Sequence, residues 1–392
     1  MTRIKGKATD FITFTRASNA TYMGPKGKLL TASANEPRVE YDASGNVLGL
    51  LVEESRTNLI PYSDLSSNWT EFNATKTISS VEAPNGDLMY ELNATATGVP
   101  TGTVTTYSST SGTYTVSAIL KAGTTNYAFV GISDNATGQA EIRFNLSSGT
   151  YDTTNVGFVG SWTNVSGSIV NLGNGFYRCS TTGTQGAGNP VSSRIIAGAP
   201  DGSRSQTVIN TKLYATGAQL ESGSFMTSLI PTSGSTATRS ADVASIGVDG
   251  FGYNQSAGTV VVEFNPYDVN PSNTYLVFDL SDGTTDERVY STTNTARHWF
   301  VRQGATIQVD IDAGTTASNT SNKLAGSYEV NNFAASLNGG SAIIDTSGNI
   351  PTKASVLYLG GTFNGYEMNG HLRSLKYYPR RLTNTQLQEL TS

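Results

Sequence analysis

Short runs in which apolar and polar residues alternate recur along most of the chain, and they constrain its fold more than any other feature. Clear examples are residues 113–120, 140–144 and 370–378. Successive side chains of a β-strand point to opposite faces, so this alternation indicates strands buried on one face. Clusters of Gly, Pro, Asn and Asp separate the runs, and no helical period lies between them. The pattern predicts antiparallel β-sandwiches.

The composition supports an all-β fold. Hydrophobic residues make up 37% of the chain and charged residues 14%, with 41 Gly and 19 Tyr. β-Branched and aromatic side chains pack well on a pleated sheet, and Gly suits tight turns. Low hydrophobicity is also typical of disordered chains. We reject disorder because aliphatic and aromatic residues recur over the whole length.

Charge and the scarcity of Cys and His exclude several function classes. The net charge is −5 and no basic run occurs, so a nucleic-acid groove is not expected. Cys179 is the single cysteine, and its alternating surroundings indicate a small buried residue rather than a catalytic thiol. The two histidines, His298 and His371, lie far from it in the sequence. Zinc chemistry and nucleophilic catalysis are therefore poorly supported.

The sequence also leads to an expectation of where the protein acts. No apolar stretch approaches the roughly 20 residues that a membrane helix requires. The first residues, MTRIK, contain no apolar core of a secretory signal. We therefore expect synthesis in a cytoplasm, without membrane insertion.

Three segments are expected along the chain. Residues 1–58 contain few apolar residues, so a module of this size needs support from a neighbouring domain, a partner chain or another surface on which it packs. Residues 59–232 and 245–392 each carry enough strand-like runs for a β-sandwich. A polar stretch at 232–238 marks the boundary between them.

Two N-terminal motifs resemble a module of tailed-bacteriophage structural proteins. They are FTRASNATY at 14–22 and GLLVEESRTNL at 49–59. This module recurs at the front of head fibres, head spikes and tail-associated fibres. The resemblance implies a virion protein whose residues 1–58 attach it to other phage structural proteins. It also implies a symmetric homo-oligomer, with a homotrimer as the first choice.

The two later segments resemble sugar-binding folds. YTVSAILKAG at 114–123, NGFYR at 174–178 and GAQLE at 217–221 are similar to the carbohydrate-binding-module jelly rolls of phage fibres and secreted glycanases, and TRSADV at 238–243 is a familiar tail to that module. Residues 370–390 resemble the closing strand and helix of concanavalin A-like, laminin-G-like lectin domains. Thr383 is expected to cap that helix, with Leu387 and Leu390 facing inward.

Glu53 and Glu54 are the one adjacent glutamate pair in the chain. Glycoside hydrolysis uses two carboxylates that face the same bond. Neighbours on a strand point to opposite faces, so these two cannot both reach one bond. Arg56 lies on the same face as Glu54, and we expect the two to form a structural ion pair.

Carboxylates of the third segment are candidate calcium ligands. Asp310 and Asp312 alternate onto one strand face, and Asp279 precedes an acidic turn that contains Asp282 and Asp286. Oxygen-rich turns bind Ca²⁺, and lectin-like domains of this kind sometimes hold it, although the spacing does not match an EF-hand. The alternative is a set of solvated turns. No other cofactor is expected.

Trp162 and Trp299 are candidate platforms for a sugar ring. Sugar sites in sandwiches use an exposed aromatic side chain flanked by polar groups. Trp162 follows a Gly-Ser pair near an expected loop, and Trp299 lies between His298 and Phe300 in a strand. Packing in the core is the alternative for both tryptophans.

The sequence therefore predicts a small N-terminal attachment module followed by two jelly-roll sandwiches. The favoured function is a head fibre or capsid decoration protein without enzymatic activity, whose sandwiches adhere weakly to host-surface glycans. Weak sites become effective when many copies bind together. The alternatives are a tail-fibre or receptor-binding protein, a glycan depolymerase with a carboxylate pair, and a structural protein without a ligand.

Overall fold

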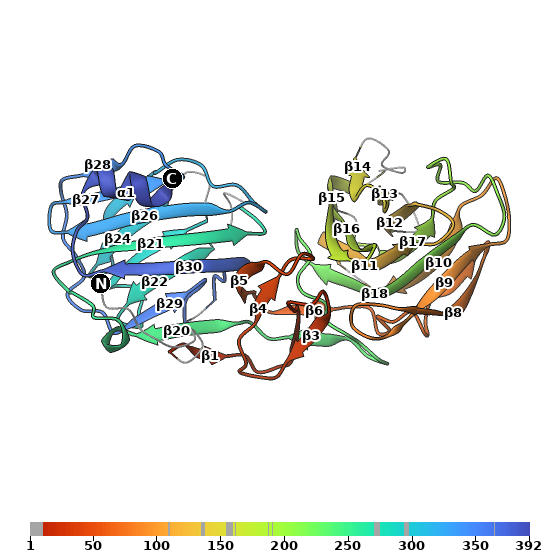
Figure 1. The fold of residues 1–392 in the computed structure, drawn as a ribbon, viewed down its shortest axis with the longest axis horizontal. Coiled ribbons are helices and arrows are strands. Elements are labelled where there is room, and N and C mark those ends of the chain that lie inside the picture. The colour runs from red at the N-terminus through yellow and green to blue at the C-terminus, as the bar shows by residue number, and fades with distance from the viewer. Residues whose placement is uncertain are drawn as a thin grey trace.

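Two β-sandwich lobes lie side by side and join at a waist (Figure 1). The computed structural model describes residues 11–108, 110–134, 138–153, 160, 162–186, 188–189, 191–269, 275–293, 298–363 and 365–392. We name the lobe drawn in orange to green the first sandwich and the lobe drawn in green to blue the second sandwich. The fold class is all-β, as predicted, with one short α-helix in the described part of the chain.

The first sandwich consists of two six-stranded antiparallel sheets. One sheet has the order β14 (Thr150–Asp152), β13 (Gln139–Asn145), β12 (Tyr127–Ser133), β17 (Val191–Ala197), β10 (Thr101–Tyr107) and β7 (Thr70–Phe72). The other has the order β15 (Trp162–Gly173), β16 (Phe176–Gln185), β11 (Gly112–Ala122), β18 (Lys212–Ser222), β9 (Leu88–Ala94) and β8 (Ala74–Glu82).

Alternation along the strands builds the core of the first sandwich. On β11, Val116, Ala118 and Leu120 point between the sheets. Ala118 stands opposite Cys179 of β16, which is fully buried in the same core. Burial raises the pKa of the Cys179 thiol well above its ordinary value. Cys179 is therefore a small core residue, as the sequence predicts.

The second sandwich consists of two seven-stranded sheets. One has the order β1 (Thr13–Thr15), β20 (Val243–Gly247), β29 (Val356–Leu359), β22 (Leu276–Ser281), β23 (Arg288–Thr292), β24 (Trp299–Gln303) and β25 (Thr306–Ile311). The other has the order β28 (Ile343–Asp345), β27 (Phe333–Leu337), β26 (Asn322–Glu329), β21 (Ala257–Pro266), β30 (Gly370–Tyr378), β5 (Val47–Val52) and β4 (Val39–Tyr41).

The N-terminal segment, residues 11–58, is part of the second sandwich and not a module of its own. Its strand β1 pairs with β20, and its strand β5 pairs with β30, so it supplies strands to both sheets. Leu51 and Val52 are fully buried there. The boundary expected at residue 58 therefore does not separate a folded unit. The physical reason is the thin apolar core of this segment, which the second sandwich completes.

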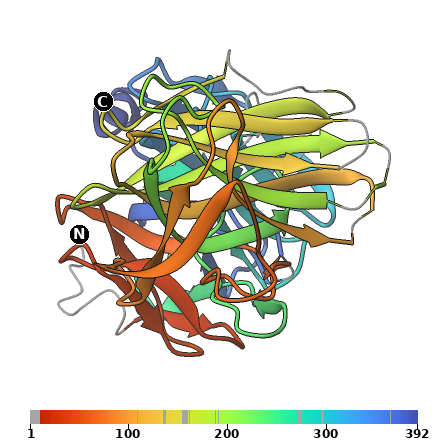
Figure 2. The same cartoon turned by 90° about the vertical axis from the view of Figure 1, so that its right-hand side faces the viewer.

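Short strands of the N-terminal segment also form the waist. β2 (Ala20–Met23) and β3 (Leu29–Ala32) make a hairpin, and β6 (Arg56–Asn58) pairs with β19 (Ala237–Arg239). Figure 2 views the molecule from the first-sandwich end and shows the red N-terminal strands along one side. Residues 237 and 238 of the expected linker, together with Arg239, are thus held in a sheet against the GLLVEESRTNL motif.

Gly49, which opens that motif, is required by close packing. Its φ of +141° is one that residues with a Cβ rarely adopt, and an added Cβ would lie 2.5 Å from the Leu372 carbonyl oxygen of β30. A larger residue at this position would push β5 away from the second sandwich.

The chain ends in α1 (Asn384–Thr391), which packs on the sheet that contains β26 and β27. The Thr383 hydroxyl accepts a hydrogen bond from the Gln386 backbone N–H, and the Gln386 side-chain oxygen accepts one from the Thr383 backbone N–H, so the predicted cap is confirmed as a capping box. Leu387 is fully buried, and Leu390 packs against the same cluster. Within the described residues, no helix has the length and apolarity needed to cross a bilayer.

Candidate functional site

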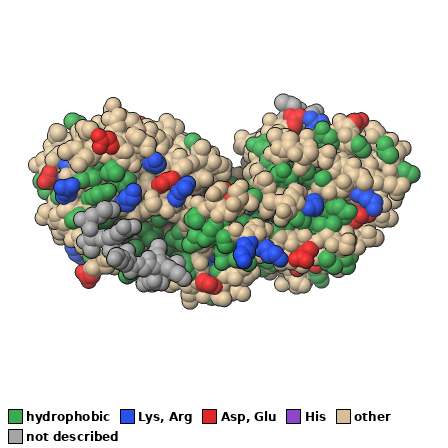
Figure 3. Space-filling view, viewed as in Figure 1, with side chains coloured by type: hydrophobic (Ala, Val, Ile, Leu, Met, Phe, Trp, Pro, Cys, Tyr) green, Lys and Arg blue, Asp and Glu red, His purple; other side chains and the backbone are tan. Residues whose placement is uncertain are grey.

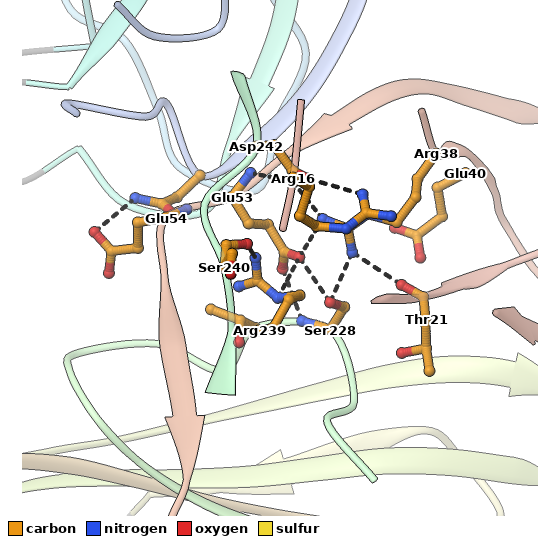
Figure 4. Close-up of polar contacts among 12 residues, drawn as sticks. Arg16, Thr21, Arg38, Glu40, Glu53, Glu54, Ser228, Arg239, Ser240 and Asp242 are labelled. Carbon is orange, nitrogen blue, oxygen red and sulfur yellow. Dashed lines mark hydrogen bonds and ion pairs between the residues drawn. The ribbon is translucent and has the colours of Figure 1, made fainter. Parts of the chain in front are cut away.

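Three sequence motifs that lie far apart in the chain meet at the waist (Figure 4). Arg16 comes from FTRASNATY, Glu53 from GLLVEESRTNL, and Asp242 from TRSADV. Together with Arg38 and Arg239 they form a buried group, which we name the ion cluster. Each of the five side chains is at most 1% exposed.

Glu53 binds residues from three parts of the chain. Its Oε2 lies 2.9 Å from Nη2 of Arg38 and 3.5 Å from Nε of Arg239. The loop residue Ser228, which follows β18, donates from its backbone N–H and its hydroxyl to the two carboxylate oxygens, each at 2.7 Å. Glu53 therefore ties the N-terminal segment to the first sandwich and to the strand pair at the waist.

Asp242 binds Arg16 and shares Arg38 with Glu53. Its Oδ1 lies 3.0 Å from Nη1 of Arg16, and its Oδ2 accepts hydrogen bonds from Nη2 of Arg38 and, at 2.9 Å, from the Glu53 backbone N–H. Arg38 thus bridges both carboxylates, and it also donates to the Thr21 carbonyl oxygen at 2.9 Å. Buried charges that are paired and hydrogen-bonded in this way hold the segments in one arrangement.

The pKa of Glu53 is shifted by its surroundings. Burial alone would raise it, but the charges of Arg239 and Arg38 and the hydrogen bonds from Ser228 outweigh burial and lower the pKa of Glu53 to about 2. Glu53 therefore stays ionised at neutral pH. A permanently ionised and fully enclosed carboxylate suits a structural link and not general acid catalysis.

Glu54 faces away from Glu53, and both lie in the link between β5 and β6. Its Oε1 lies 2.5 Å from Nη2 of Arg56, which confirms the predicted ion pair. The other oxygen, Oε2, accepts from Nδ2 of Asn369 at 3.3 Å. Because Glu53 and Glu54 have separate partners on opposite sides of the chain, they do not form a carboxylate pair around one bond.

A cavity of about 480 Å³ lies beside the ion cluster, within the size range of small-ligand sites. Ser228, which binds Glu53, also lines this cavity, so the cluster and the cavity share a wall. On the face drawn in Figure 3 the molecule narrows at the waist, and hydrophobic side chains gather there. All three parts of the chain contribute to the lining, notably Met23, Leu29, Glu40, Ile119, Arg178, Phe225, Tyr267, Asn319 and His371.

Aromatic rings form one side of the cavity. The ring centroids of Phe225 and Tyr267 are 6.2 Å apart, and the Tyr267 ring meets the His371 ring edge-on at 5.6 Å. Nε2 of His371 lies 2.7 Å from Oε2 of Glu40, which orients the imidazole. Burial raises the pKa of Tyr267 well above its ordinary value, so its hydroxyl stays protonated. The three rings are inclined to one another and offer an aromatic surface with polar groups at its edge.

Arg178 contributes a charged group to the lining of the cavity. It projects from β16, and its Nη1 and Nη2 donate to the Thr227 carbonyl oxygen at 2.6 Å and to the Ser117 hydroxyl at 3.0 Å. Nε of Arg178 and Nδ1 of His371 are both buried and lack a hydrogen-bond partner among the described residues. Buried polar atoms of this kind are normally satisfied by water or a ligand.

The two tryptophans proposed as sugar platforms lie in the cores instead. Trp162 is 1% exposed and Trp299 is 0% exposed. Trp299 packs flat against the backbone of Gly326, where an added Cβ would come within 2.0 Å of the indole. Neither ring has a face available to a ligand, so the alternative of core packing holds. In β24 the residue that faces away from the core cluster is Phe300, which stacks on Tyr290 at 4.8 Å.

The structure does not bring the three proposed calcium ligands together. Asp279 lies on β22 and Asp310 on β25; paired positions place Tyr290 and Phe300 between them, a separation of about 14 Å at 4.8 Å per strand. Asp279 is engaged by Nε of Arg288 and the Thr362 hydroxyl, each at 3.0 Å. The Asp312 side chain is 59% exposed. No cluster of three or more potential ligands occurs among the described residues.

Sequence reasoning missed most of the cavity. Arg178 is the last residue of the NGFYR motif and precedes Cys179. Because neighbours on a strand face opposite ways, a buried Cys179 places the Arg178 side chain on the outer face of the sheet. Tyr267, Phe225 and Glu40 lie in unrelated parts of the sequence, and no local pattern connects them.

No known protein-family model matches the sequence, and no curated protein matches it. Several solved structures are similar in part. The CBM40 module of a Ruminococcus gnavus IT-sialidase, bound to α2,3-sialyllactose, is 19% identical over 35% of this chain and 83% of that one, with a TM-score of 0.30.

Two other similar structures cover different shares of the chain. Domain 4 of an extracellular arabinanase from Geobacillus stearothermophilus, bound to arabinotriose, is 14% identical over 39% of this chain and 73% of its own, with a TM-score of 0.31. Domains LG4-5 of the mouse laminin α1 chain are 10% identical over 86% of this chain and 96% of their own length, with a TM-score of 0.26. At such TM-scores the likeness carries no functional argument, and the all-β class of this chain rests on its own sheets.

Proposed function

We propose that the chain is a non-enzymatic virion surface protein of a tailed bacteriophage, of the head-fibre or decoration type, which displays two β-sandwiches and holds host-surface glycans in the cavity at the waist. The phage assignment is supported by the resemblance of residues 14–22 and 49–59 to the attachment-type module of such proteins. The adhesive role is supported by the lining of the cavity.

The observation that carries the glycan-binding part is the aromatic wall of Phe225, Tyr267 and His371 facing polar groups across a space of about 480 Å³. Pyranose rings present apolar C–H faces and hydroxyl edges, which fit an aromatic surface flanked by hydrogen-bonding groups. The ion cluster supports the wall of this cavity, because Ser228 lines the cavity and donates to Glu53 of the cluster.

Replacing Tyr267 by Ala is expected to weaken glycan binding about tenfold, or ~1.4 kcal/mol, because the central ring of the wall is removed. A glycan array with the purified chain identifies a ligand, and calorimetric titration then compares the variants. Tyr366→Ala is the matched control, since Tyr366 is 54% exposed and does not line the cavity. Equal losses in both variants, or no glycan bound by the wild type, would contradict the proposal.

The location on the particle is tested separately. A cryo-EM reconstruction of the phage that carries this chain is expected to show paired lobes of this shape on the capsid, in groups of three. Lobes at the tail tip would replace the head-fibre assignment by a tail-fibre one. Lobes in groups other than three would contradict the homotrimer. A purified particle that lacks the chain would contradict the virion role altogether.

A further inference from the structure

Arg178 is a charged lining residue of the cavity that touches no carboxylate. Its guanidinium contacts two neutral oxygens, those of Thr227 and Ser117, and no ion pair of Arg178 occurs in the part of the chain that the structure describes. Glu221 lies beyond Thr227, whose backbone N–H and hydroxyl bind it at 2.9 Å and 2.7 Å. The cation therefore faces the cavity side without an anionic group in contact.

The acidic residues of the cavity are already engaged. Oε1 of Glu40 accepts the Met23 backbone N–H at 2.9 Å, and Oε2 is bound to His371. Asp42 accepts from the backbone N–H groups of Ser44 and Asn46 at 2.8 Å and 2.9 Å. Neither carboxylate is free to turn towards Arg178. An anionic group brought by a ligand would supply the missing contact, and such charge-assisted bonds to Arg are among the strongest in proteins.

The other polar and aromatic groups of the cavity indicate which further chemical groups the ligand carries. With Nε2 of His371 engaged by Glu40, Nδ1 is buried and unpartnered, and in the tautomer that donates to Glu40 it accepts a hydrogen bond. A hydroxyl group fits this position. The rings of Tyr267 and Phe225 provide the apolar surface between the two polar ends. A ring with an apolar face, hydroxyl groups and one carboxylate satisfies all three.

We propose that the cavity at the waist selects acidic sugars, meaning a uronic or sialic acid residue whose carboxylate binds Arg178 while a hydroxyl binds His371 and the ring packs on Tyr267. The inference rests on the proposed glycan-binding function and makes it specific. Arg178 is a binding and specificity-determining residue in this view, and it reaches the ligand directly.

The test compares matched probes on the full chain by calorimetric titration and ligand-observed NMR. Methyl β-D-glucuronide and methyl β-D-glucoside differ only in the C6 group, and methyl α-sialoside represents the second acidic class. We expect one of the two acidic probes to bind at least about tenfold more tightly than the glucoside, and this preference to shrink as NaCl is raised from 50 to 500 mM because salt screens the charge contact. Which acidic probe binds identifies the class.

Arg178→Gln is expected to remove the preference for the acidic probe, while Arg178→Lys retains part of it. Arg143→Gln is the control, because Arg143 is a partly exposed arginine of β13 paired with Asp152 and lies outside the cavity lining. The wild-type probe comparison stands even if an Arg178 variant fails to fold. Equal affinity for glucoside and acidic probes overturns the acidic-sugar inference and leaves the glycan-binding function standing. If no sugar binds, either among the three probes or on the glycan array, both the acidic-sugar inference and the glycan-binding function are overturned.

Discussion

Glu53→Gln is expected to lower the free energy of unfolding by about 3–5 kcal/mol, the range found when one partner of a buried ion pair is removed. The variant keeps the volume of the side chain but leaves Arg239 without its carboxylate and Arg38 with Asp242 alone. Two buried cations then lose compensation in a site that excludes water. Urea denaturation of the full chain, followed by tryptophan fluorescence and circular dichroism, measures the loss.

Glu82→Gln is the matched control. Glu82 pairs with Lys28 at 3.7 Å, with side chains 59% and 68% exposed, and exposed pairs of this kind contribute less than about 1 kcal/mol. A loss below about 1 kcal/mol for Glu53→Gln as well would show that the ion cluster does not hold the waist together. The expected loss is large because the charges of the ion cluster are buried, whereas the charges of Glu82 and Lys28 are exposed to water.

The stability of the wild type should also depend on the ionisation of Glu53. Glu53 has its pKa lowered from 4.5 to about 2 in the folded chain, so its stabilisation is complete above about pH 4.5 and is lost as the pH falls towards 2. The difference corresponds to about 3 kcal/mol. Glu53→Gln is expected to lack this part of the acid dependence, because the amide does not titrate.

Local patterns in the sequence predicted local structure. Alternation at 370–378 predicted β30, and Thr383 predicted the start of α1. The pairing of Glu54 with Arg56 also followed, because residues two apart share a strand face. Each of these features depends on neighbours within about four residues.

Long-range pairings were not predictable in this way. The contact of β5 with β30 sets Leu50 opposite Leu372, more than 300 residues away, and no periodicity of either strand specifies the other. The same is true of Arg16 and Asp242. In a strand with apolar residues on both faces, the sequence does not show which face packs in the core. His298, Trp299 and Phe300 follow one another, and only the tertiary structure places Trp299 against Gly326 and Phe300 on the other face. Burial, not local sequence, decided against the tryptophan platform.

Glu367→Gln is expected to stabilise the chain at pH 8 by about 3 kcal/mol and to have little effect near pH 4.5. Glu367 is 6% exposed and lies near the waist; burial, with the charges of Glu54 and Asp242, raises its pKa from 4.5 to about 7. A raised pKa means that the folded state holds the proton more tightly. The contribution of Glu367 to wild-type stability is therefore greatest below about pH 4.5 and declines as the pH rises through 7, whereas glutamine avoids the cost of ionising a buried group.

Urea denaturation at pH 4.5, 6 and 8 separates this effect from a general change in packing, because a packing change shifts all three values alike. Glu389→Gln on the exposed side of α1 is the control and should match the wild type at each pH. A variant that is destabilised at pH 8 would show that ionised Glu367 compensates Arg239 in the ion cluster. The waist would then contain three buried carboxylates opposite three arginines, and Glu53 and Asp242 would no longer account for its cohesion alone.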